Sequence, residues 1–566
     1  MSSTEPTTPP GLDGWVVGVM GGPDPRHELA QTGLTATYAD RWIALSGPVA
    51  TVGDHAVAGR VVLDGLDPGT DPRAALAATW QRGGPGALMV PQGMFGAVIH
   101  DGATGRAMLT RDPLGERTMY YTRPDDKGRV WFSDRLTELR RVGAVGRELS
   151  LASLRDYLVF GFVPGTNTMY ADAFEVPPGS TVDLVSAKVS TWWQPEEQLD
   201  NDRSVADNAS LLRSVLIDAI ASRRPQGPVG VQLTAGLDAS AVTALLCHAD
   251  PSTVHTFAVH FGTGGPDDLP FVDRVVDAAS PAFHHVIELT PAELAATLPA
   301  AMAVLDDPIG DAVTVPRLAL GRRAAQLVPV LFSGDGAGPL FGGVNDQPML
   351  LAAVYGASVA KGELDDVYLR SQQRFHPDLD LLLRPEVAAE LEGAPPPTAA
   401  VAPYLSSGTM SLFVNRLFEA DLHLEGTDHI LTRTANLAAA TGILGRTPLL
   451  DRRIVEAAFS MPPTHKVAGP NGRGALARAL DDLLPATVLD RPQATGRSPI
   501  DTWFTGALRD EATRRLLSSS ARIARYLDLS IVRHWALDGH RGHDRNGDKL
   551  WQLLSLEEWL EANDAG

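Results

Sequence analysis

The chain has 566 residues, enough for two to four domains of ordinary size, and 44% of them are hydrophobic, enough for packed cores. Its formal net charge of −20, from 48 basic and 68 acidic residues, argues against nonspecific nucleic-acid binding. No run of about 20 apolar residues is present, so no membrane span is expected, and a single cysteine, Cys247, excludes a disulfide framework and a cysteine-based zinc site.

Residues 1–14 are polar and rich in proline, without the basic and apolar regions of a signal peptide, so we expect a disordered tail and a cytoplasmic protein. Short apolar or alternating runs separated by glycine and aspartate then predict a mostly β domain over residues 15–195. The runs lie at 15–22, 93–101, 106–112, 118–122, 130–134, 161–170 and 176–185. The charged, polar segment 196–207 is typical of a linker.

The pattern changes in residues 208–566, which we predict to form a second domain. A helical period at 209–223 is followed by a strand, a glycine-bearing loop and a helix over 227–249. Further strands are expected at 255–261, 284–289 and 328–336, with helices at 271–279 and 319–327, and mostly helices beyond 345. Strands that alternate with helices predict an α/β fold with a parallel sheet, which binds ligands beyond the carboxyl ends of its strands.

The loop of that strand–loop–helix unit, residues 231–240, carries the strongest chemical signal. Small residues let backbone N–H groups approach an anion, and the helix N-terminus favours phosphate. Thr234 and Ser240 could donate hydroxyl hydrogen bonds, and Asp238 could hold Mg²⁺. For this segment alone, a plain strand–turn–helix with Asp238 as a helix cap is the favoured interpretation.

The loop resembles the pyrophosphate loop Ser-Gly-Gly-x-Asp-Ser-Ser of ATP-pyrophosphatase-type synthetases. Residues 331–343 resemble the class B asparagine synthetase motif Ser-Gly-Glu-Gly-x-Asp-Glu-Leu-Phe-Gly-Gly, and Leu305–Asp311 resembles the acidic segment between the two. Residues 446–456 are similar to Arg-x-Pro-Phe-Leu-Asp-x-x-x-Val-Glu. In the N-terminal half, residues 93–101, 111–121 and 131–134 resemble the glutaminase-domain signature.

This resemblance covers about residues 15–505. It implies an Ntn-type αββα glutaminase-like domain followed by an α/β synthetase domain with a helical C-terminal part. It also implies ATP and Mg²⁺ as cofactors, with Mg²⁺ on Asp238. The positions that match the nucleotide site of the family are Leu233, Thr234, Gly236, Leu237, Asp238, Ser240, Val259 and Gly334. Asp335 becomes the acid–base candidate.

The glutaminase half departs from the family at its nucleophile. An active domain of this kind uses a cysteine at the mature N-terminus, with the free α-amine as its base. Here Val17 occupies the place of the cysteine within the strand, and Cys247 falls in the other domain, where it is interpreted as a small core residue. We therefore expect an inactive glutaminase domain.

The synthetase half departs from the family as well. Ala235 and Ala239 replace a glycine and a serine of the loop, and Gly338 stands in place of a metal-binding aspartate. Gln493 replaces the lysine of Arg-Pro-Lys, a cation whose loss can cost roughly 10²–10³ in rate. Arg497 is the nearest substitute and becomes the second catalytic candidate.

An inactive amidotransferase domain on a synthetase domain resembles the β-lactam synthetase and the lasso-peptide macrolactam synthetase branches. These imply adenylation of a carboxylate and attack by an amine of the same substrate, a small molecule or a peptide. A precursor peptide and biosynthetic partner proteins would accompany the peptide case, and neither nucleic acid nor membrane is expected. The alternative is a homologue that does not adenylate, either a pseudoenzyme scaffold or an enzyme that uses another activated donor.

Overall fold

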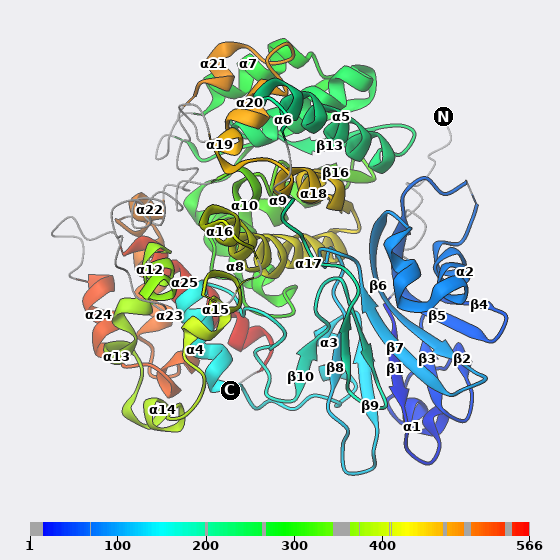
Figure 1. Cartoon of the computed structure of the whole chain (residues 1–566). Coiled ribbons are helices and arrows are strands. Elements are labelled where there is room, and N and C mark those ends of the chain that lie inside the picture. The colour runs from blue at the N-terminus through cyan, green and yellow to red at the C-terminus, as the bar shows by residue number, and fades with distance from the viewer. Residues whose placement is uncertain are drawn as a thin grey trace, which may run out of the picture. The chain divides into compact units, whose positions relative to one another are not determined.

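The computed structural model describes residues 15–564 apart from 68, 199–201, 263–267, 343–362, 373, 407, 409, 468–472, 492–499, 506 and 538–545. Its contacts divide the chain into two units. The first contains residues up to 148 together with 165–194 and a three-residue piece at 434–436, and the second contains the rest. Residues 149–164, inside the range predicted for the first domain, therefore belong by contact to the second unit (Figure 1).

The first unit is built from two six-stranded antiparallel sheets. One sheet has the order β10-β8-β9-β1-β3-β2, and the other has the order β12-β11-β7-β6-β5-β4. The strands of the first sheet are β1 (Val17–Met20), β2 (Tyr38–Ala39), β3 (Ile43–Ser46), β8 (Tyr120–Thr122), β9 (Val130–Ser133) and β10 (Ala173–Glu175). Those of the second are β4 (Val49–Val52), β5 (His55–Leu63), β6 (Gly93–Asp101), β7 (Arg106–Arg111), β11 (Ser180–Asp183) and β12 (Val189–Thr191).

Helices cover the outer faces of these sheets and complete an αββα fold. Helices α1 (Pro25–Gln31) and α3 (Leu136–Arg141) contact the sheet that contains β1, and α2 (Pro72–Gly83) contacts β5 and β4. Apolar side chains from both sheets form the core between them, among them Ile43, Val98, Leu109 and Phe132. The Ntn-type layer predicted from the sequence is confirmed, whereas the strands over residues 38–63 and the helices α1 and α2 were not predicted.

The second unit is organised around a five-stranded parallel sheet with the order β15-β14-β13-β16-β17. Its strands are β13 (Val229–Gln232), β14 (Val254–His260), β15 (Phe283–Glu288), β16 (Val330–Phe332) and β17 (Leu444–Arg446). The chain proceeds outward from β13 through β14 to β15, then returns to β16 beside β13 and continues to β17. The reversal of strand order between β13 and β16 makes their carboxyl ends the expected ligand site.

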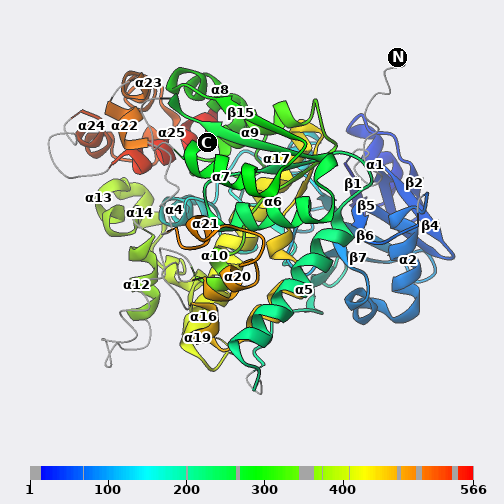
Figure 2. The ribbon, with the colours of Figure 1, turned by 90° about the horizontal axis from the view of Figure 1, so that it is seen from above.

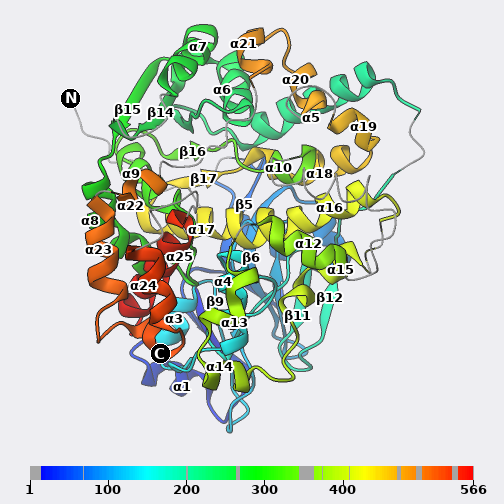
Figure 3. The same ribbon diagram turned by 90° about the vertical axis from the view of Figure 1, so that its left-hand side faces the viewer.

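Helices lie on both faces of this sheet, as predicted (Figure 3). Helices α5 (Val205–Arg223), α6 (Leu237–Ala249) and α7 (Leu269–Ala279) lie side by side in Figure 2, and α6 contacts β13 and β14. Helix α9 (Thr314–Ala324) packs on the other face, where Leu320 and Ala324 meet Phe257 of β14. Cys247 is buried on α6, where burial raises the pKa of its thiol to about 12, so it is a core residue as interpreted.

The remainder of the second unit is helical. It includes α4 (Leu151–Phe160), α8 (Pro291–Ala303), α10 (Gly338–Phe341), α12 (Glu363–Ser371), α16 (Phe413–Asp421), the π-helix η7 (Leu422–Leu431), α17 (Thr432–Thr441), α18 (Arg452–Phe459), α19 (Pro463–Lys466), α23 (Ala507–Leu516) and α25 (Gly547–Ala562). Helix α25 buries Trp551 and Trp559. Across the described residues, no helix has the length and apolar character that a membrane crossing requires.

Candidate functional site

The predicted nucleotide loop follows β13 and leads directly into the N-terminus of α6. Gly236 precedes the helix without a capping side chain, so backbone N–H groups of the first turn stay available to an anion. The hydroxyl of Thr234 accepts a hydrogen bond from Gly236 N at 3.4 Å and is exposed. Ser240 is buried and donates its hydroxyl to the Gly236 carbonyl at 2.8 Å, so within the structure it stabilises the helix start.

The second glycine-rich loop, after β16, packs directly on this helix start. A Cβ atom at Gly334 would lie 2.3 Å from Ala239 N and 2.4 Å from Ala239 Cα, distances that only glycine avoids. Gly336 has a φ of +105° and faces Leu450, which fixes the turn toward α10. The structure thus brings Leu233–Ser240 together with Gly334 and Asp335 at the switch point of the sheet.

Asp335, the acid–base candidate, forms ion pairs with two arginines. Its Oδ1 accepts a hydrogen bond from Arg317 Nη2 at 2.7 Å, its Oδ2 pairs with Arg317 Nη1, and Arg433 Nη2 lies 3.7 Å from Oδ2. Burial raises the pKa of Asp335, but these guanidinium groups outweigh it and hold the pKa below its ordinary value. A carboxylate stabilised in this way is a weak base, and its catalytic role stays a prediction.

Arg433 extends the network to Asp311, in the predicted acidic segment. Asp311 accepts hydrogen bonds from Thr314 N and Oγ1 at 2.7 Å, from His429 Nε2 at 2.5 Å and from Arg433 Nη1. Burial raises the pKa of Asp311, but Arg433 and His429 bring it well below the ordinary value. Sequence reasoning selected the acidic residues and missed Arg317, His429 and Arg433, because their partners lie 18 to 122 residues away.

Asp238, the predicted Mg²⁺ ligand, forms an ion pair through Oδ2 with Arg473 Nη1, while its Oδ1 is buried without a hydrogen-bond partner. Burial raises the pKa of Asp238, Asp335 adds to the increase, and Arg473 opposes it. Burial is the largest of these effects, so the pKa of Asp238 is raised on balance despite its pairing with Arg473. Arg473 lies in a glycine-rich run, Gly469–Gly474, a composition that permits close approach but does not single out the arginine.

Arg491, the arginine of the Arg-Pro segment, contacts the loop itself. Its Nη1 donates to the Ala235 carbonyl at 2.8 Å, and its Nη2 pairs with Asp268 at 2.7 Å. The guanidinium also stacks over Phe271 at 3.8 Å from the ring centroid. Arg491 therefore supports the loop, whereas Gln493 and the catalytic candidate Arg497 lie outside the described residues.

The other predicted positions are structural neighbours of the site. Leu233 is buried and donates its N–H to the Phe257 carbonyl at 2.8 Å. The side chain of Val259 packs against the apolar cluster under α9, which leaves its backbone, near the carboxyl end of β14, for any contact with adenosine. In the motif at 446–456, Asp451 caps α18 and pairs with Arg223 at 3.1 Å, a role in folding.

The oxygen-bearing side chains of the site offer few ligands for Mg²⁺. Mg²⁺ is usually held by one or two carboxylates together with substrate phosphates and water. Asp238 offers one free oxygen, Gly338 offers none, and Asp335 is held by Arg317. Within the described ranges, no group of three or more potential metal-ligating side chains exists. The residues fit one carboxylate contact to a phosphate-bound Mg²⁺ and do not fit the two-carboxylate arrangement that the resemblance implies.

In the first unit, the start of β1 has no nucleophile. Val16 N is a peptide amide that donates to Asp134 Oδ1 at 3.0 Å, and Arg60 Nε lies 2.9 Å from Asp134 Oδ2. Ser133, the partner of Val17 across the sheet, donates its hydroxyl to the Val16 carbonyl at 2.7 Å. Val16 is thus held by hydrogen bonds as an internal residue of the chain, and the side chain of Val17 is buried.

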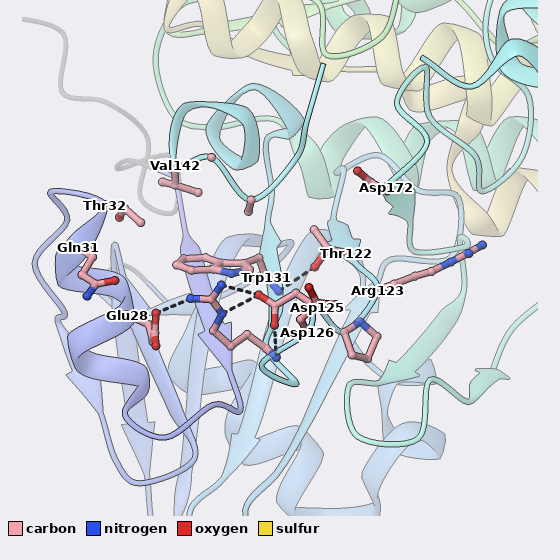
Figure 4. A pocket seen from close by; sticks show the side chains of 14 residues that line it. Glu28, Gln31, Thr32, Thr122, Arg123, Asp125, Asp126, Trp131, Val142 and Asp172 are labelled. Carbon is pink, nitrogen blue, oxygen red and sulfur yellow. Dashed lines mark hydrogen bonds and ion pairs between the residues drawn. The ribbon is translucent and has the colours of Figure 1, made fainter. Parts of the chain in front are cut away.

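A polar pocket of about 500 Å³ lies elsewhere in this unit (Figure 4). Arg129 crosses it between Glu28 of α1 and Asp125, with Trp131 alongside. The charge of the Arg129 guanidinium is thus neutralised by the carboxylates of Glu28 and Asp125. Its lining comes largely from the β8–β9 turn and includes neither Ser133 nor Val17 nor any of the predicted site residues.

Fold and site together define a two-part protein, an amidotransferase-like αββα unit joined in one chain to an α/β nucleotide-loop unit. The chain belongs to the asparagine synthase family, whose model matches residues 211–561. The glutamine amidotransferase domain model matches residues 70–193.

Similar proteins include a putative asparagine synthetase (glutamine-hydrolyzing) of Mycobacterium tuberculosis H37Rv, 26% identical over 86% of this chain and 79% of the relative. Asparagine synthetase (glutamine-hydrolyzing) 1 of Bacillus subtilis 168 is 24% identical over 86% of this chain and 80% of the relative. Among solved structures, the glutamine phosphoribosylpyrophosphate amidotransferase of B. subtilis covers 48% of this chain and 65% of its own, at 10% identity and a TM-score of 0.22. Family membership supports an ATP-dependent amidation or ligase activity.

Proposed function

We propose that the chain is an ATP-dependent amide ligase that adenylates a carboxylate and joins it to an amine of the same substrate, without hydrolysing glutamine. The observation that carries the proposal is the uncapped start of α6 at the switch point of the sheet, where Asp238 keeps a buried free oxygen. ATP, when bound, supplies the adenylyl group. Backbone N–H groups of the α6 start would bind its pyrophosphate, with Leu233, Val259 and Gly334 toward the adenosine.

The proposal of an internal amine rests on the first unit. The relatives are named as glutamine-hydrolysing, and such hydrolysis needs a nucleophile. Val17 has no nucleophilic group, and the amide of Val16 is already bonded to Asp134. Because the start of β1 offers no nucleophile for glutamine hydrolysis, an amine carried by the substrate becomes the natural attacking group. A macrolactam- or β-lactam-type product of natural-product biosynthesis, from a peptide or a small molecule, fits that chemistry.

A second candidate is a homologue that does not adenylate. The ion pairs of Asp238 with Arg473 and of Asp335 with Arg317 favour it, because both acidic groups expected to work on the nucleotide already have partners. A scaffold role, or the use of another activated donor, would need neither carboxylate free.

The test is ATP–pyrophosphate exchange with two sets of acids, one whose members carry an amine in the same molecule and one whose members do not. Exchange with an amine-bearing acid, followed by release of its cyclised amide, is the expected result. Formation of asparagine from aspartate and ammonia would replace the cyclase proposal with ordinary asparagine synthesis. No ATP binding and no exchange with any acid would leave the second candidate. Glutamate release from glutamine above background would overturn the inactive first unit.

A further inference from the structure

One cation of the proposed nucleotide site, Arg473, contacts both of its glycine-rich segments. Arg473 uses Nη1 to pair with Asp238 and Nε to donate to the Gly342 carbonyl at 3.1 Å. These two contacts, one on each glycine-rich loop, hold the guanidinium in the space between them. Nη2 is left directed toward position 338.

Position 338 is where the family pattern has its second metal-binding carboxylate. A Cβ added to Gly338 would lie 3.7 Å from Arg473 Nη2, the one contact within 4 Å that the described residues outside its own helix would make with it. A carboxylate at 338 would therefore project onto the guanidinium. The family pattern has a negative carboxylate at position 338. In this chain the carboxylate is missing, and the positive guanidinium of Arg473 occupies the space beside that position, so the local charge is reversed.

The other arginines of the site cannot supply this charge. Arg317 and Arg433 are committed to Asp335 and Asp311, and Arg491 is committed to Asp268 and the Ala235 carbonyl. Arg473 has one carboxylate partner, and that partner keeps a free oxygen. A guanidinium binds two phosphate oxygens at once in a fixed geometry and keeps its charge at any physiological pH.

We propose that Arg473 takes over the phosphate-neutralising role of the second metal contact, so that the nucleotide binds this chain largely independently of Mg²⁺. This inference rests on the proposed function, because it concerns the same ATP site. Arg473 would reach the phosphate groups through Nη2, while Asp238 holds the guanidinium in position through Nη1. Arg473 is thus a specificity residue that lets the site accept the free nucleotide as well as its magnesium complex.

The experiment is calorimetric titration of the full chain with ATP, in excess EDTA and in excess MgCl₂. Wild type is expected to bind with dissociation constants that differ by less than about threefold between the two conditions. Arg473→Met should weaken binding in EDTA by at least about tenfold, and Arg473→Lys, which keeps the charge without the fork, should weaken it less. Arg322→Met, an exposed arginine of α9, is the matched control and should bind as wild type does.

The double variant Arg473→Met, Gly338→Asp reinstates the carboxylate and removes the competing cation. It is expected to bind ATP at least about tenfold more tightly with Mg²⁺ than without, and to bind Mn²⁺ together with ATP in electron paramagnetic resonance, whereas wild type retains little Mn²⁺. Melting curves identify any variant that does not fold. Magnesium-dependent binding by wild type, unchanged in Arg473→Met, would overturn the inference and leave the proposed function intact. Absence of ATP binding by wild type in both conditions would overturn the proposed function itself.

Discussion

The absence of a side chain at Gly334 determines how closely the two loops of the site approach each other. The loop after β16 can lie against the start of α6 only because residue 334 lacks a side chain, since a methyl group there would overlap the backbone of Ala239. The overlap involves backbone atoms, so no side-chain rotation can relieve it. The two loops that would hold the nucleotide must separate if residue 334 is enlarged.

We therefore predict that Gly334→Ala weakens ATP binding by at least about tenfold. Calorimetric titration would measure the affinity, and circular dichroism would show that the secondary structure persists. Gly86→Ala is the control, because a methyl group at Gly86 would meet no atom within 4 Å. Unchanged affinity in Gly334→Ala would show that the contact between the loops is not needed for binding.

Lys466 is a buried ammonium group of α19. It is fully buried, donates to Asn415 Oδ1 at 2.8 Å, and lies over the rings of Phe418 and Phe459. Burial lowers its pKa to about 7, although Glu197 opposes the shift. Nearby on α16, burial and the charge of Glu197 raise the pKa of Glu419 to about 7.

The sign of the pH effect follows from proton counts. Between pH 7 and the ordinary lysine value of 10.5, the unfolded chain holds a proton on Lys466 that the folded chain has released, so stability rises with pH. Between 4.5 and 7, the folded chain keeps a proton on Glu419 that the unfolded chain has lost, so this contribution falls as pH rises. The combined contribution of Glu419 and Lys466 to the free energy of unfolding is therefore lowest near pH 7.

We predict that the melting temperature of the second unit rises between pH 7 and pH 9, by an amount equivalent to about 2–3 kcal/mol from Lys466. Lys466→Met should remove most of that rise, because the variant has no proton to release. Lys188→Met, at an exposed lysine, should keep it. Scanning calorimetry at both pH values would decide, and equal rises in wild type and Lys466→Met would contradict the shift.

At the scale of elements, the π-helix η7 and the helix α17 that follows it deliver two side chains to one carboxylate. His429 and Arg433, four residues apart, both bind Asp311, while Asp311 also binds the start of α9 through Thr314. π-Helical segments are rare and often occur at functional sites. Here the junction connects the C-terminal helices with the loop that supports Asp335.

Removing the shared carboxylate should therefore be costly. We predict that Asp311→Ala destabilises the second unit by about 3–5 kcal/mol, since Arg433 would be left buried with Asp335, at 3.7 Å, as its remaining carboxylate partner among the described residues. Asp482→Ala, which breaks the exposed pair with Arg213, should cost less than about 1 kcal/mol. Thermal melting of the two variants beside wild type is the measurement, and similar losses in both would contradict a special role for Asp311.

At the scale of the whole molecule, the second unit includes a helix from the middle of the N-terminal half. On α4, Tyr157 donates its hydroxyl to the Gln552 carbonyl at 2.8 Å, and Gln552 Nε2 donates back to the Tyr157 carbonyl at 2.6 Å. Gly310 N donates to the Gly161 carbonyl at 2.7 Å, and Phe160 and Phe162 enter an apolar cluster with α12 and α16.

This interleaving predicts that a fragment of residues 205–566 cannot form a complete core. We expect it to melt without cooperativity and to regain a cooperative transition when a peptide of residues 149–164 is added. The same peptide with Tyr157→Ala and Phe160→Ala should not restore the transition. A fragment that melts and binds ATP like the full chain, with or without the peptide, would support the simpler boundary between 195 and 208.

The sequence predicts more of the fold than of the candidate site. Strand–helix alternation after residue 208 predicted the α/β architecture, and the turn-separated runs before 195 predicted a mostly β domain, because periodicity records which side chains must be buried. The αββα layer was expected from the family resemblance. The strands β2, β3, β4 and β5 were all missed. β2 and β4 are short and lie within exposed or half-buried stretches that show no clear alternation, whereas β3 and β5 are mostly buried.

The site was predictable only as far as its local loops. Thr234–Ser240 and Gly334 follow their strands directly, and the structure brings them together. The arginines that neutralise this site, Arg317, Arg433 and Arg473, come from distant segments, and an arginine in a helix or a glycine-rich run has many ordinary explanations. Long-range charge pairing depends on tertiary contacts that no local pattern records.

The amide of Val16 has a practical consequence. Because the first strand is entered by a peptide bond whose N–H is already bonded to Asp134, no step of the proposed reaction depends on a liberated terminal amine. A carrier domain or a surface anchor can therefore be joined ahead of residue 15 without consuming a reactive group, as it would in an enzyme that works through its own first residue. The chain is thus suited to immobilisation from that side, with its ATP affinity expected to be the same on the support as in solution.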